Sequence, residues 1–301
     1  LSPAHLGEVF CTIYADLYQQ RKEHPKKKFP AINAMLKLAL NGVYGDSNSR
    51  FSPFYDPLYT MSITINGQLL LCKLSEMLMR IQGLTMIQIN TDGLTVRLPR
   101  TRIEDLRELC KNWEELTGLE LEEVAYNRMF IRDVNNYIGE YEDGKLKRKG
   151  CYAHETTLDN PDTGEVMWHN NHSSLVVAKA AEAFLVRGEP IEEFIRGHAD
   201  LLDFMILAKV PRSSRLVWSD GYGEFNLQNV TRYYVTDDVH GGDLVKIMPP
   251  LPKAPDKERR IGQCAGWKVN VCNNMNDAFA PINYDYYIQE ARKICEPLRS
   301  A

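Results

Sequence analysis

The chain has 301 residues, of which 44% are hydrophobic and 25% are charged, an ordinary composition for a globular protein. No apolar run reaches the ~18–20 residues that a membrane-spanning helix needs, and no signal peptide is recognisable. We therefore expect a cytoplasmic protein without a membrane partner. The cysteines number seven and form no CxxC pair, which disfavours both a disulfide framework and a zinc site.

The net charge is −4, but the charges are unevenly distributed. Basic side chains cluster within residues 21–28, 145–149 and 253–260, whereas acidic ones concentrate within residues 104–123. Basic strips beside an acidic outer face suit a protein that grips a phosphate backbone along one groove. The alternative is that each run is a solvated loop.

In the first half of the chain, apolar spacing predicts helices joined by short loops, and one β-hairpin. A basic, proline-containing loop joins the first two helices into an antiparallel pair. The hairpin covers residues 86–98 and has residues 90–93 at its tip. The predicted helices cover residues 7–22, 31–43, 61–80 and 101–116.

In the second half, residues 124–141 read as strands, followed by an Asp143-Gly144 turn and a basic strand. A domain boundary is expected near residues 155–172. Helices are predicted over residues 174–187, 191–207 and about 284–298, with an irregular segment after Pro211.

The segment from Lys37 to Gly45 reads Lys-Leu-Ala-Leu-Asn-Gly-Val-Tyr-Gly. Helical spacing puts Lys37, Asn41 and Tyr44 on one face. A cation can meet phosphates as a point charge, and an aromatic ring can pack on a base or a sugar. This face is therefore a candidate nucleotide site, although it is also what an ordinary helix end looks like.

The hairpin tip reads Asn90-Thr91-Asp92-Gly93. A carboxylate at a strand end can coordinate a divalent metal, because the sheet fixes its position. Asp-Gly is also a common hairpin turn, so Asp92 alone is a weak indication of a metal site.

Together, these segments resemble the replicative family B DNA polymerases, above all those of tailed bacteriophages. The family motif Lys-x-x-x-Asn-Ser-x-Tyr-Gly matches residues 37–45 except at Gly42. The family's Ser-Ile-Thr helix with a downstream Gly-Arg corresponds to residues 62–64 and Gly67-Gln68, and its Asp-Thr-Asp-Ser tip to residues 90–93. Residues 133–138 stand where the family has Lys-Lys-x-Tyr, and residues 147–150 where it has a Lys-Gly stretch.

The resemblance implies an α+β fold, a right-hand polymerase. Residues 1–45 would form a helical fingers hairpin, residues 46–155 an antiparallel-sheet palm with flanking helices, and residues 156–301 a mostly helical thumb and C-terminal region. The family's N-terminal exonuclease and the segment with its other metal-binding aspartate have no counterpart here. We therefore expect a truncation, or one half of a split enzyme, that is inactive alone.

The implied function is template-directed DNA synthesis in DNA replication, by nucleotidyl transfer with two Mg²⁺ ions, or Mn²⁺ as an alternative. Asp92 would be the catalytic, metal-binding carboxylate. The implied partners are primer–template DNA, deoxyribonucleoside triphosphates and the missing N-terminal portion or a complementary subunit, in a host cytoplasm if the protein is viral. Nucleotide contacts would come from Lys37, Asn41, Tyr44 and Arg21, and DNA contacts from Gly45, Thr91, Tyr137, Lys147 and Lys149.

Two departures from the family pattern leave an alternative open. Asn90 replaces the first acid of the tip, and Gly93 replaces its serine. Gly93 removes a hydroxyl and is expected to ease the turn. An inactivated remnant that binds primer–template DNA without catalysis is the alternative. An RNA-dependent polymerase is disfavoured by residues 37–45.

Overall fold

The computed structural model describes residues 3–154, 173–251, 258–274 and 281–298. Residues 1–123 and 124–301 form two compact units. Within the described ranges, no helix has both the length and the apolar character needed to cross a membrane. The expected boundary at residues 155–172 lies outside the described residues, and the three-domain division stays a prediction.

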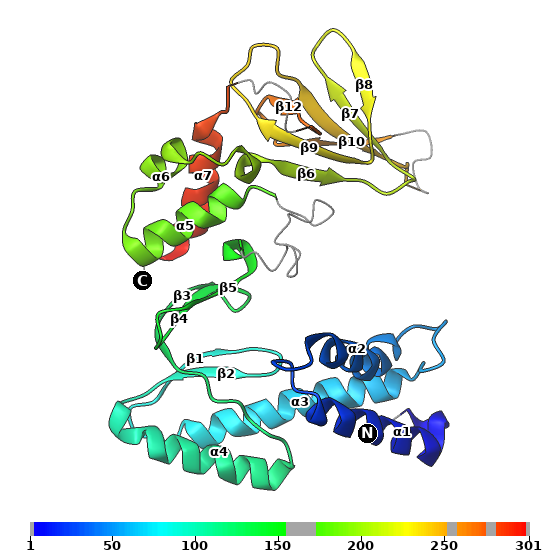
Figure 1. The fold of residues 1–301 in the computed structure, drawn as a ribbon, viewed down its shortest axis with the longest axis vertical. Helices are drawn as coiled ribbons and strands as arrows, with labels where there is room; N and C mark the ends of the chain where they lie inside the picture. The colour runs from blue at the N-terminus through cyan, green and yellow to red at the C-terminus, as the bar shows by residue number, and fades with distance from the viewer. Residues whose placement is uncertain (1–2, 155–172, 252–257, 275–280, 299–301) are drawn as a thin grey trace. The chain divides into compact units, whose positions relative to one another are not determined.

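The first unit opens with α1 (Gly7–Glu23) and α2 (Pro30–Asp46), which form the predicted helical hairpin (Figure 1). Pro30 suits the first turn of α2 because the amides there need no intrahelical acceptor. Asn33 on α2 satisfies the end of α1: its side-chain amide donates to the carbonyl of His24 at 2.7 Å and to that of Arg21 at 3.4 Å. The end of α1 therefore lies beside the start of α2.

The long helix α3 (Pro57–Leu78) begins four residues before the predicted start at residue 61. Asp56 is its N-cap, with a carboxylate that accepts from the Tyr59 amide at 3.0 Å, and Pro57 occupies the first turn. The Asp56-Pro57 pair thus marks the start of α3, four residues before the start predicted from apolar periodicity.

A small core joins α3, α4 (Ile103–Thr117) and the predicted hairpin of β1 (Thr85–Ile89) and β2 (Leu94–Arg97). Trp113 is buried there, and its indole donates to the Leu70 carbonyl at 3.0 Å. Leu94 and Val96 of β2 pack on the same cluster. The strand that follows the hairpin tip is therefore packed against the two helices.

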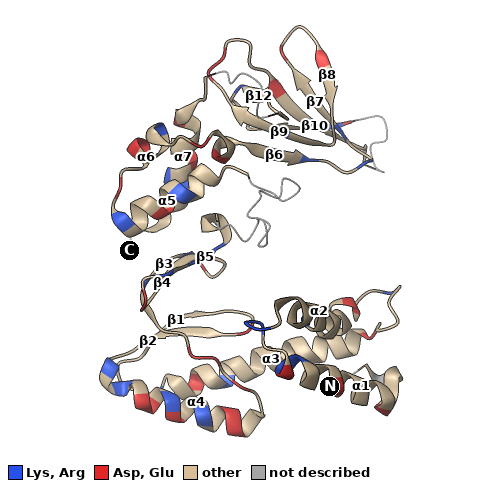
Figure 2. Cartoon of the chain, viewed as in Figure 1, with Lys and Arg blue, Asp and Glu red and all other residues tan. Residues whose placement is uncertain are grey.

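The acidic stretch of α4 is not a bare acidic face. Acidic and basic residues intermingle along the helix (Figure 2), and Arg107 pairs with Glu104 at 2.9 Å and with Glu123 at 3.0 Å. Arg102 pairs with Asp105 at 3.0 Å. Much of the negative charge in this region is therefore locally compensated.

The second unit begins with an antiparallel sheet of β3 (Tyr126–Asp133), β4 (Asn136–Tyr141) and β5 (Leu146–Lys149), as the turn residues predicted. Asp133 closes the first turn, where its carboxylate accepts from the Asn135 amide at 2.9 Å. Asn136 extends this turn, because its side-chain oxygen accepts from the Cys151 amide at 2.7 Å. The chain after β5 is thereby tied back to the β3–β4 turn.

Helices α5 (Leu175–Arg187), α6 (Ile191–Gly197) and α7 (Tyr284–Cys295) pack together in this unit (Figure 1). Small buried alanines on α5 allow close approach to α7. The buried Tyr287 hydroxyl donates to the Phe204 carbonyl at 2.8 Å and accepts from the Val235 amide at 3.0 Å. One phenol thus links α7 to two other elements of the core.

The expectation of a mostly helical region after residue 156 is wrong for the residues described there. The predicted helix 191–207 ends at Gly197, and a short 3₁₀ turn (Leu201–Phe204) and a strand follow. Two antiparallel sheets replace the predicted irregular segment, in the orders β11-β10-β7-β8 and β12-β9-β6. Their strands are β6 (Ile206–Lys209), β7 (Arg215–Ser219), β8 (Glu224–Leu227), β9 (Val230–Val235), β10 (Asp243–Met248), β11 (Arg259–Gln263) and β12 (Val269–Val271).

Candidate functional site

The predicted nucleotide-binding residues of α2 are exposed on one side of the helix. Lys37, Asn41 and Tyr44 are all exposed, and Tyr44 keeps 42% of its surface. They lie next to the buried face of α2, made of Leu36, Leu40 and Val43. The helix is therefore anchored on one side and presents a cation, an amide and an aromatic ring on the adjoining side.

Tyr44 is fixed by a residue of the second sequence motif. Its hydroxyl lies 3.0 Å from Oγ1 of Thr64 on α3. The Thr64 hydroxyl donates to the Thr60 carbonyl at 2.9 Å, so Tyr44 is the donor of the 3.0 Å bond. One turn away, the buried Ser47 hydroxyl contacts Thr60 Oγ1 at 2.6 Å. The two motifs, 20 residues apart in sequence, thus meet through hydroxyl groups.

Arg21 and Lys37 lie on the two helices of the hairpin, Arg21 in the last turn of α1 and Lys37 in the middle of α2. The Arg21 carbonyl accepts from the Asn33 side chain, and Lys37 is one helical turn beyond Asn33. Arg21 is half-buried and Lys37 is exposed. No ion pair involves either side chain within the part of the chain that the structure describes. Both cations are therefore available to an anionic ligand.

The tip of the β1–β2 hairpin presents Asp92 to solvent. Asn90 shapes the turn through two hydrogen bonds. Its side-chain oxygen accepts from the backbone amide of Thr91 at 2.7 Å, and its backbone amide donates to the Gly93 carbonyl at 2.8 Å. In the described structure, the Asp92 carboxylate takes part in no ion pair or hydrogen bond. It is thus a free carboxylate on a turn that is held by hydrogen bonds of Asn90.

The expectation that Gly93 eases this turn is wrong. Gly93 does not have a positive φ, and a Cβ placed there would meet no atom within 4 Å. A serine would therefore fit without strain. An aspartate at position 90 could accept the same Thr91 amide bond, so the turn does not demand either departure from the family motif.

A two-metal centre does not fit the described residues by themselves. Mg²⁺ takes oxygen ligands in octahedral geometry, commonly one or two carboxylates with substrate phosphates and water. Asp92 supplies one carboxylate at the tip, and no cluster of three or more His, Cys, Asp or Glu side chains suitable for a metal occurs among the residues described. Asp92 is therefore the carboxylate that this hairpin tip offers to a metal ion.

The predicted DNA contacts fall into both units and differ in exposure. Gly45 and Thr91 are exposed in the first unit. In the second unit Lys149 is exposed and Lys147 is half-buried, but Tyr137 keeps only 8% of its surface. Tyr137 therefore packs in the sheet, and its role as a DNA contact stays a prediction.

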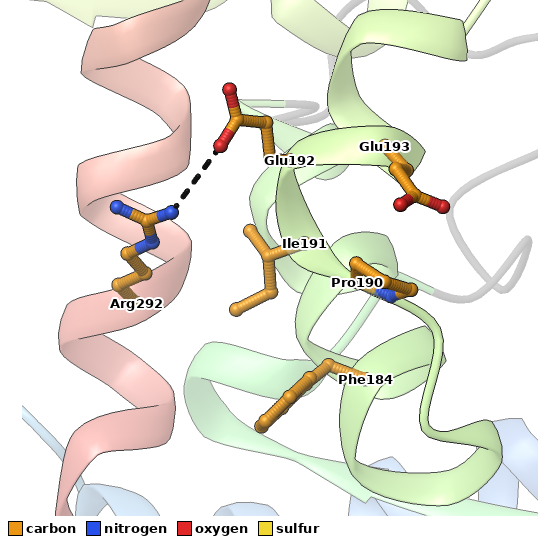
Figure 3. A pocket seen from close by; sticks show the side chains of 6 residues that line it. All are labelled: Phe184, Pro190, Ile191, Glu192, Glu193 and Arg292. Atoms are coloured by element: carbon orange, nitrogen blue, oxygen red, sulfur yellow. Dashed lines mark ion pairs between the residues drawn. The ribbon is translucent and has the colours of Figure 1, made fainter.

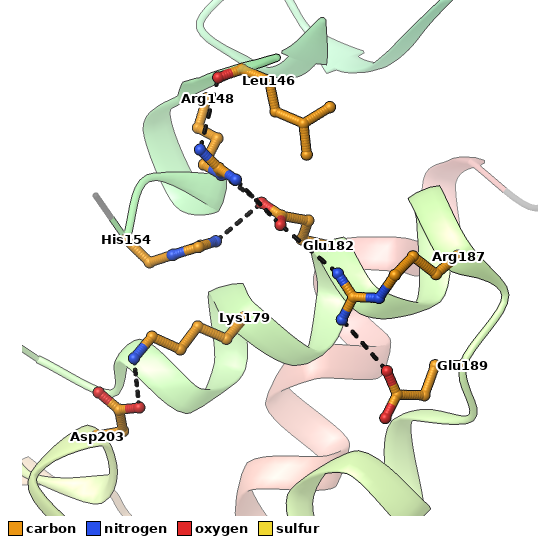
Figure 4. A network of polar contacts seen from close by, with 8 residues as sticks. All are labelled: Leu146, Arg148, His154, Lys179, Glu182, Arg187, Glu189 and Asp203. Carbon is orange, nitrogen blue, oxygen red and sulfur yellow. Dashed lines mark hydrogen bonds and ion pairs between the residues drawn. The ribbon is translucent and has the colours of Figure 1, made fainter. Parts of the chain in front are cut away.

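The basic residues of the run 145–149 have different partners in the sheet. Lys145 pairs with Asp143 at 2.6 Å. Arg148 donates to the buried carboxylate of Glu182 on α5 (Figure 4). Lys147 donates to the Tyr126 hydroxyl at 3.0 Å. Only Lys147 and Lys149 of this run are thus free of a carboxylate partner among the described residues.

Glu182 is the centre of this polar network, which sequence reasoning did not find. His154 Nε2 lies 2.9 Å from its carboxylate, on the side opposite Arg187 (Figure 4). Burial raises the pKa of Glu182, but hydrogen bonds from His154 and Arg148 and their charges outweigh it and bring the pKa to about 2. A glutamate amid alanines on a helix face was the available signal of a buried ion pair.

A surface pocket of about 300 Å³ lies in the second unit (Figure 3). The ion pair of Arg292 with Glu192, 3.5 Å apart, crosses it from α7 to α6. None of the predicted site residues contributes to it. The pocket is lined by Phe184, Pro190, Ile191, Glu192, Glu193 and Arg292.

Part of the chain is similar to archaeal DNA polymerases. No protein family model matches it. It is 26% identical over 141 residues to DNA polymerase 1 of Saccharolobus solfataricus, which covers 44% of this chain and 16% of that protein. It is also 26% identical over 138 residues to DNA polymerase 1 of Sulfolobus acidocaldarius, covering 45% of this chain and 15% of that protein. The chain thus spans less than a fifth of these relatives, and the similarity supports a role in DNA synthesis at most.

Proposed function

We propose that this chain takes part in template-directed DNA synthesis as the nucleotide-binding and primer–template-binding portion of a family B type polymerase. The observation that carries the proposal is the bond between Tyr44 and Thr64. It joins the two helical motifs that define the sequence resemblance and leaves Lys37 and Asn41 exposed on the same face as Tyr44. The similarity to DNA polymerase 1 from two archaea supports it independently.

In this proposal the α2 face binds the incoming nucleotide. Lys37 meets the triphosphate as a compact point charge, and Arg21 on the preceding helix adds a second cation. The Tyr44 ring lies against the sugar. Since its hydroxyl is tied to Thr64, the ring cannot readily swing aside, and a ribose 2′ hydroxyl would meet it. Selection of deoxyribonucleotides follows from this restraint.

Asp92 supplies one metal-binding carboxylate in the proposal. A divalent metal would neutralise charge on the phosphates and activate the attacking hydroxyl when bound. Because Asp92 alone does not complete such a centre, the chemical step in this proposal requires a second carboxylate. In this proposal the described residues contribute nucleotide and duplex binding together with this ligand.

A non-catalytic primer–template binding module is the second candidate function. The observation in its favour is Asn90, which leaves the tip with one carboxylate where the family motif has two. The two candidates agree on DNA binding and differ on Asp92. Under the second, Asp92 is only a turn residue.

One set of measurements separates these candidates. Fluorescence anisotropy would give the affinity of the chain for a primer–template, and a gel assay would follow primer extension with Mg²⁺ or Mn²⁺, with and without a polypeptide that supplies the second carboxylate. The variants are Asp92→Asn and, as a matched control, Asp46→Asn, an exposed aspartate at the end of α2.

Extension that Asp92→Asn abolishes while DNA binding persists supports the polymerase. DNA binding in every mixture without any extension supports the binding module. Absence of measurable affinity for primer–template at low salt would overturn both candidates.

A further inference from the structure

The sheet β3–β4–β5 has two chemically different faces. Ile138 of β4 and Leu146 of β5 belong to the core cluster of the second unit, and Arg148 points to Glu182 on α5 from the same side of β5. Side chains alternate along a strand, so Lys147 and Lys149 lie on the opposite face. The register puts Tyr137 across from Lys149 and Gly139 across from Lys147 on that face. This Lys147 face is aromatic and basic.

Lys147 is held by an uncharged oxygen, the hydroxyl of Tyr126. Its Nζ donates to the Tyr126 hydroxyl at 3.0 Å and lies 5.8 Å from the centre of the Tyr126 ring. A phenol carries no charge at neutral pH, so it orients the ammonium without cancelling its charge. An ammonium has three donors, and two of them remain for a ligand.

The surroundings of Lys147 favour its charged form. The hydrogen bond to Tyr126 raises the pKa of Lys147, against the lowering effect of its partial burial. By contrast, the nearby Lys145 forms an ion pair with Asp143, with an N–O distance of 2.6 Å. Two lysines two residues apart thus differ in what they can offer an anion.

Two neighbours on β4 restrict the Tyr126 ring. It stacks on Tyr141, with ring centres 5.1 Å apart and planes 20° apart. It also lies close to Gly139, where an added Cβ would come within 2.7 Å of its Cε1. A larger residue at position 139 would therefore displace the ring. The glycine and the stack together determine where the Tyr126 hydroxyl, and so the Lys147 ammonium, is placed.

We propose that Tyr126 is a positioning residue that holds the Lys147 ammonium, still charged, for contact with a backbone phosphate of primer–template DNA. This inference rests on the proposed function for the identity of its ligand. It goes beyond it in assigning a role to Tyr126, Tyr141 and Gly139. A phosphate contact of this kind adds affinity without sequence preference.

A double-mutant cycle tests the inference. Tyr126→Phe keeps the ring and the stack and removes only the acceptor, and Lys147→Met removes the charge. Affinity for primer–template is measured by anisotropy for wild type, both single variants and the double variant, at several salt concentrations. Lys145→Met and Tyr222→Phe are the controls, since Lys145 is already paired and Tyr222 is 99% exposed on a distant turn of the same unit.

If Tyr126 acts through Lys147, Tyr126→Phe weakens binding roughly fivefold in the wild-type background and has almost no effect beside Lys147→Met. Lys147→Met lowers the salt-dependence slope by about 0.9. The thermal unfolding midpoint of Tyr126→Phe stays at the wild-type value, which a merely structural role would not allow.

Additive effects in the cycle, with wild type binding DNA normally, would overturn the inference and leave the proposed function intact. A lower unfolding midpoint that accounts for the whole loss of binding would also overturn it. A wild-type chain that does not bind primer–template would remove the proposed function and this inference together.

Discussion

Arg148 on β5 and the buried Glu182 on α5 form a bidentate ion pair across 34 residues of sequence, with Nη2 of Arg148 3.1 Å from Oε1 of Glu182. His154 adds a third contact to the same carboxylate at 2.9 Å. The pair anchors the inner face of the sheet whose outer face carries Lys147 and Lys149. Loss of this anchor should therefore disturb both stability and the proposed DNA-binding face.

Replacing Glu182 should destabilise the second unit and change its response to acid. Glu182→Gln leaves the partly buried Arg148 without its counter-charge, which should cost about 3 kcal/mol of unfolding free energy at pH 7. Because the folded-state pKa of Glu182 lies below its ordinary value, the stability that it adds is fully present above pH 4.5 and is lost as the pH falls towards about 2.

Thermal unfolding between pH 7 and pH 2.5 would check both effects, with Glu189→Gln as an exposed control whose cost should stay below about 1 kcal/mol. Glu182→Gln should give a flatter profile than wild type in acid. An equally steep profile for the variant would mean that other carboxylates cause the acid sensitivity.

The glycine after β5 should not tolerate a side chain. Gly150 has φ +62°, and a Cβ there would lie within 2.5 Å of the Asn135 carbonyl and against the Asn136 side chain that bonds Cys151. Gly150→Ala should therefore cost at least about 3 kcal/mol, from backbone strain and overpacking together. Gly144→Ala is the control, since its φ is +80° but no atom lies within 4 Å. Chemical denaturation should show about 1 kcal/mol for that variant, and equal losses would contradict the packing argument.

Thr64 should govern sugar discrimination through Tyr44. Thr64→Val keeps the size of the side chain and removes the acceptor of the Tyr44 hydroxyl, so the ring gains freedom. The preference for a deoxyribonucleotide over the matching ribonucleotide should narrow roughly fivefold, the worth of one hydrogen bond. Titration with labelled nucleotides would measure the ratio. Thr12→Val, on the exposed side of α1, should leave it unchanged.

Restoring the second acid at the hairpin tip should strengthen metal binding. Asn90→Asp can keep the turn bond to the Thr91 amide and adds a negative charge beside Asp92. One more charge near a divalent ion in water is worth about 1–2 kcal/mol, so Mn²⁺ affinity should rise roughly tenfold. Isothermal titration or Mn²⁺ relaxation would measure this, with Gly93→Ser as a sterically neutral comparison. No gain, or an equal gain in an Asp92→Asn background, would show that Asp92 does not take part.

Removing the Lys37 charge tests its proposed contact with the triphosphate directly. Lys37→Ala should weaken triphosphate binding roughly tenfold, while Lys73→Ala, an exposed lysine on α3, should not. The difference should shrink at high salt, because exposed charges are screened. Equal losses for both variants would indicate a general charge effect rather than a site.

Local signals were enough to predict the elements of the first unit and the first sheet of the second. Helical periodicity, turn residues and the Asp143-Gly144 pair act between neighbours in sequence, so the helices α1, α2 and α4 and the hairpin β1–β2 were recognisable. The strands after residue 205 were not, because they have three to six residues each and owe their stability to pairing across the sheets. The Val230–Val235 run, rich in β-branched and aromatic residues, was the clearest missed indication.

The sequence alone determined which residues are proposed to carry the chemistry: Lys37, Tyr44 and Asp92 were predicted from the resemblance in motif order and spacing. Only the tertiary structure decided which charges are available. Arg148 forms an ion pair with a carboxylate 34 residues away, whereas the adjacent Lys147 donates to the uncharged hydroxyl of Tyr126. The physical reason is that side chains alternate along a strand, so neighbouring residues lie on opposite faces of the sheet. The residues that each side chain then contacts depend on packing between segments that are distant in sequence.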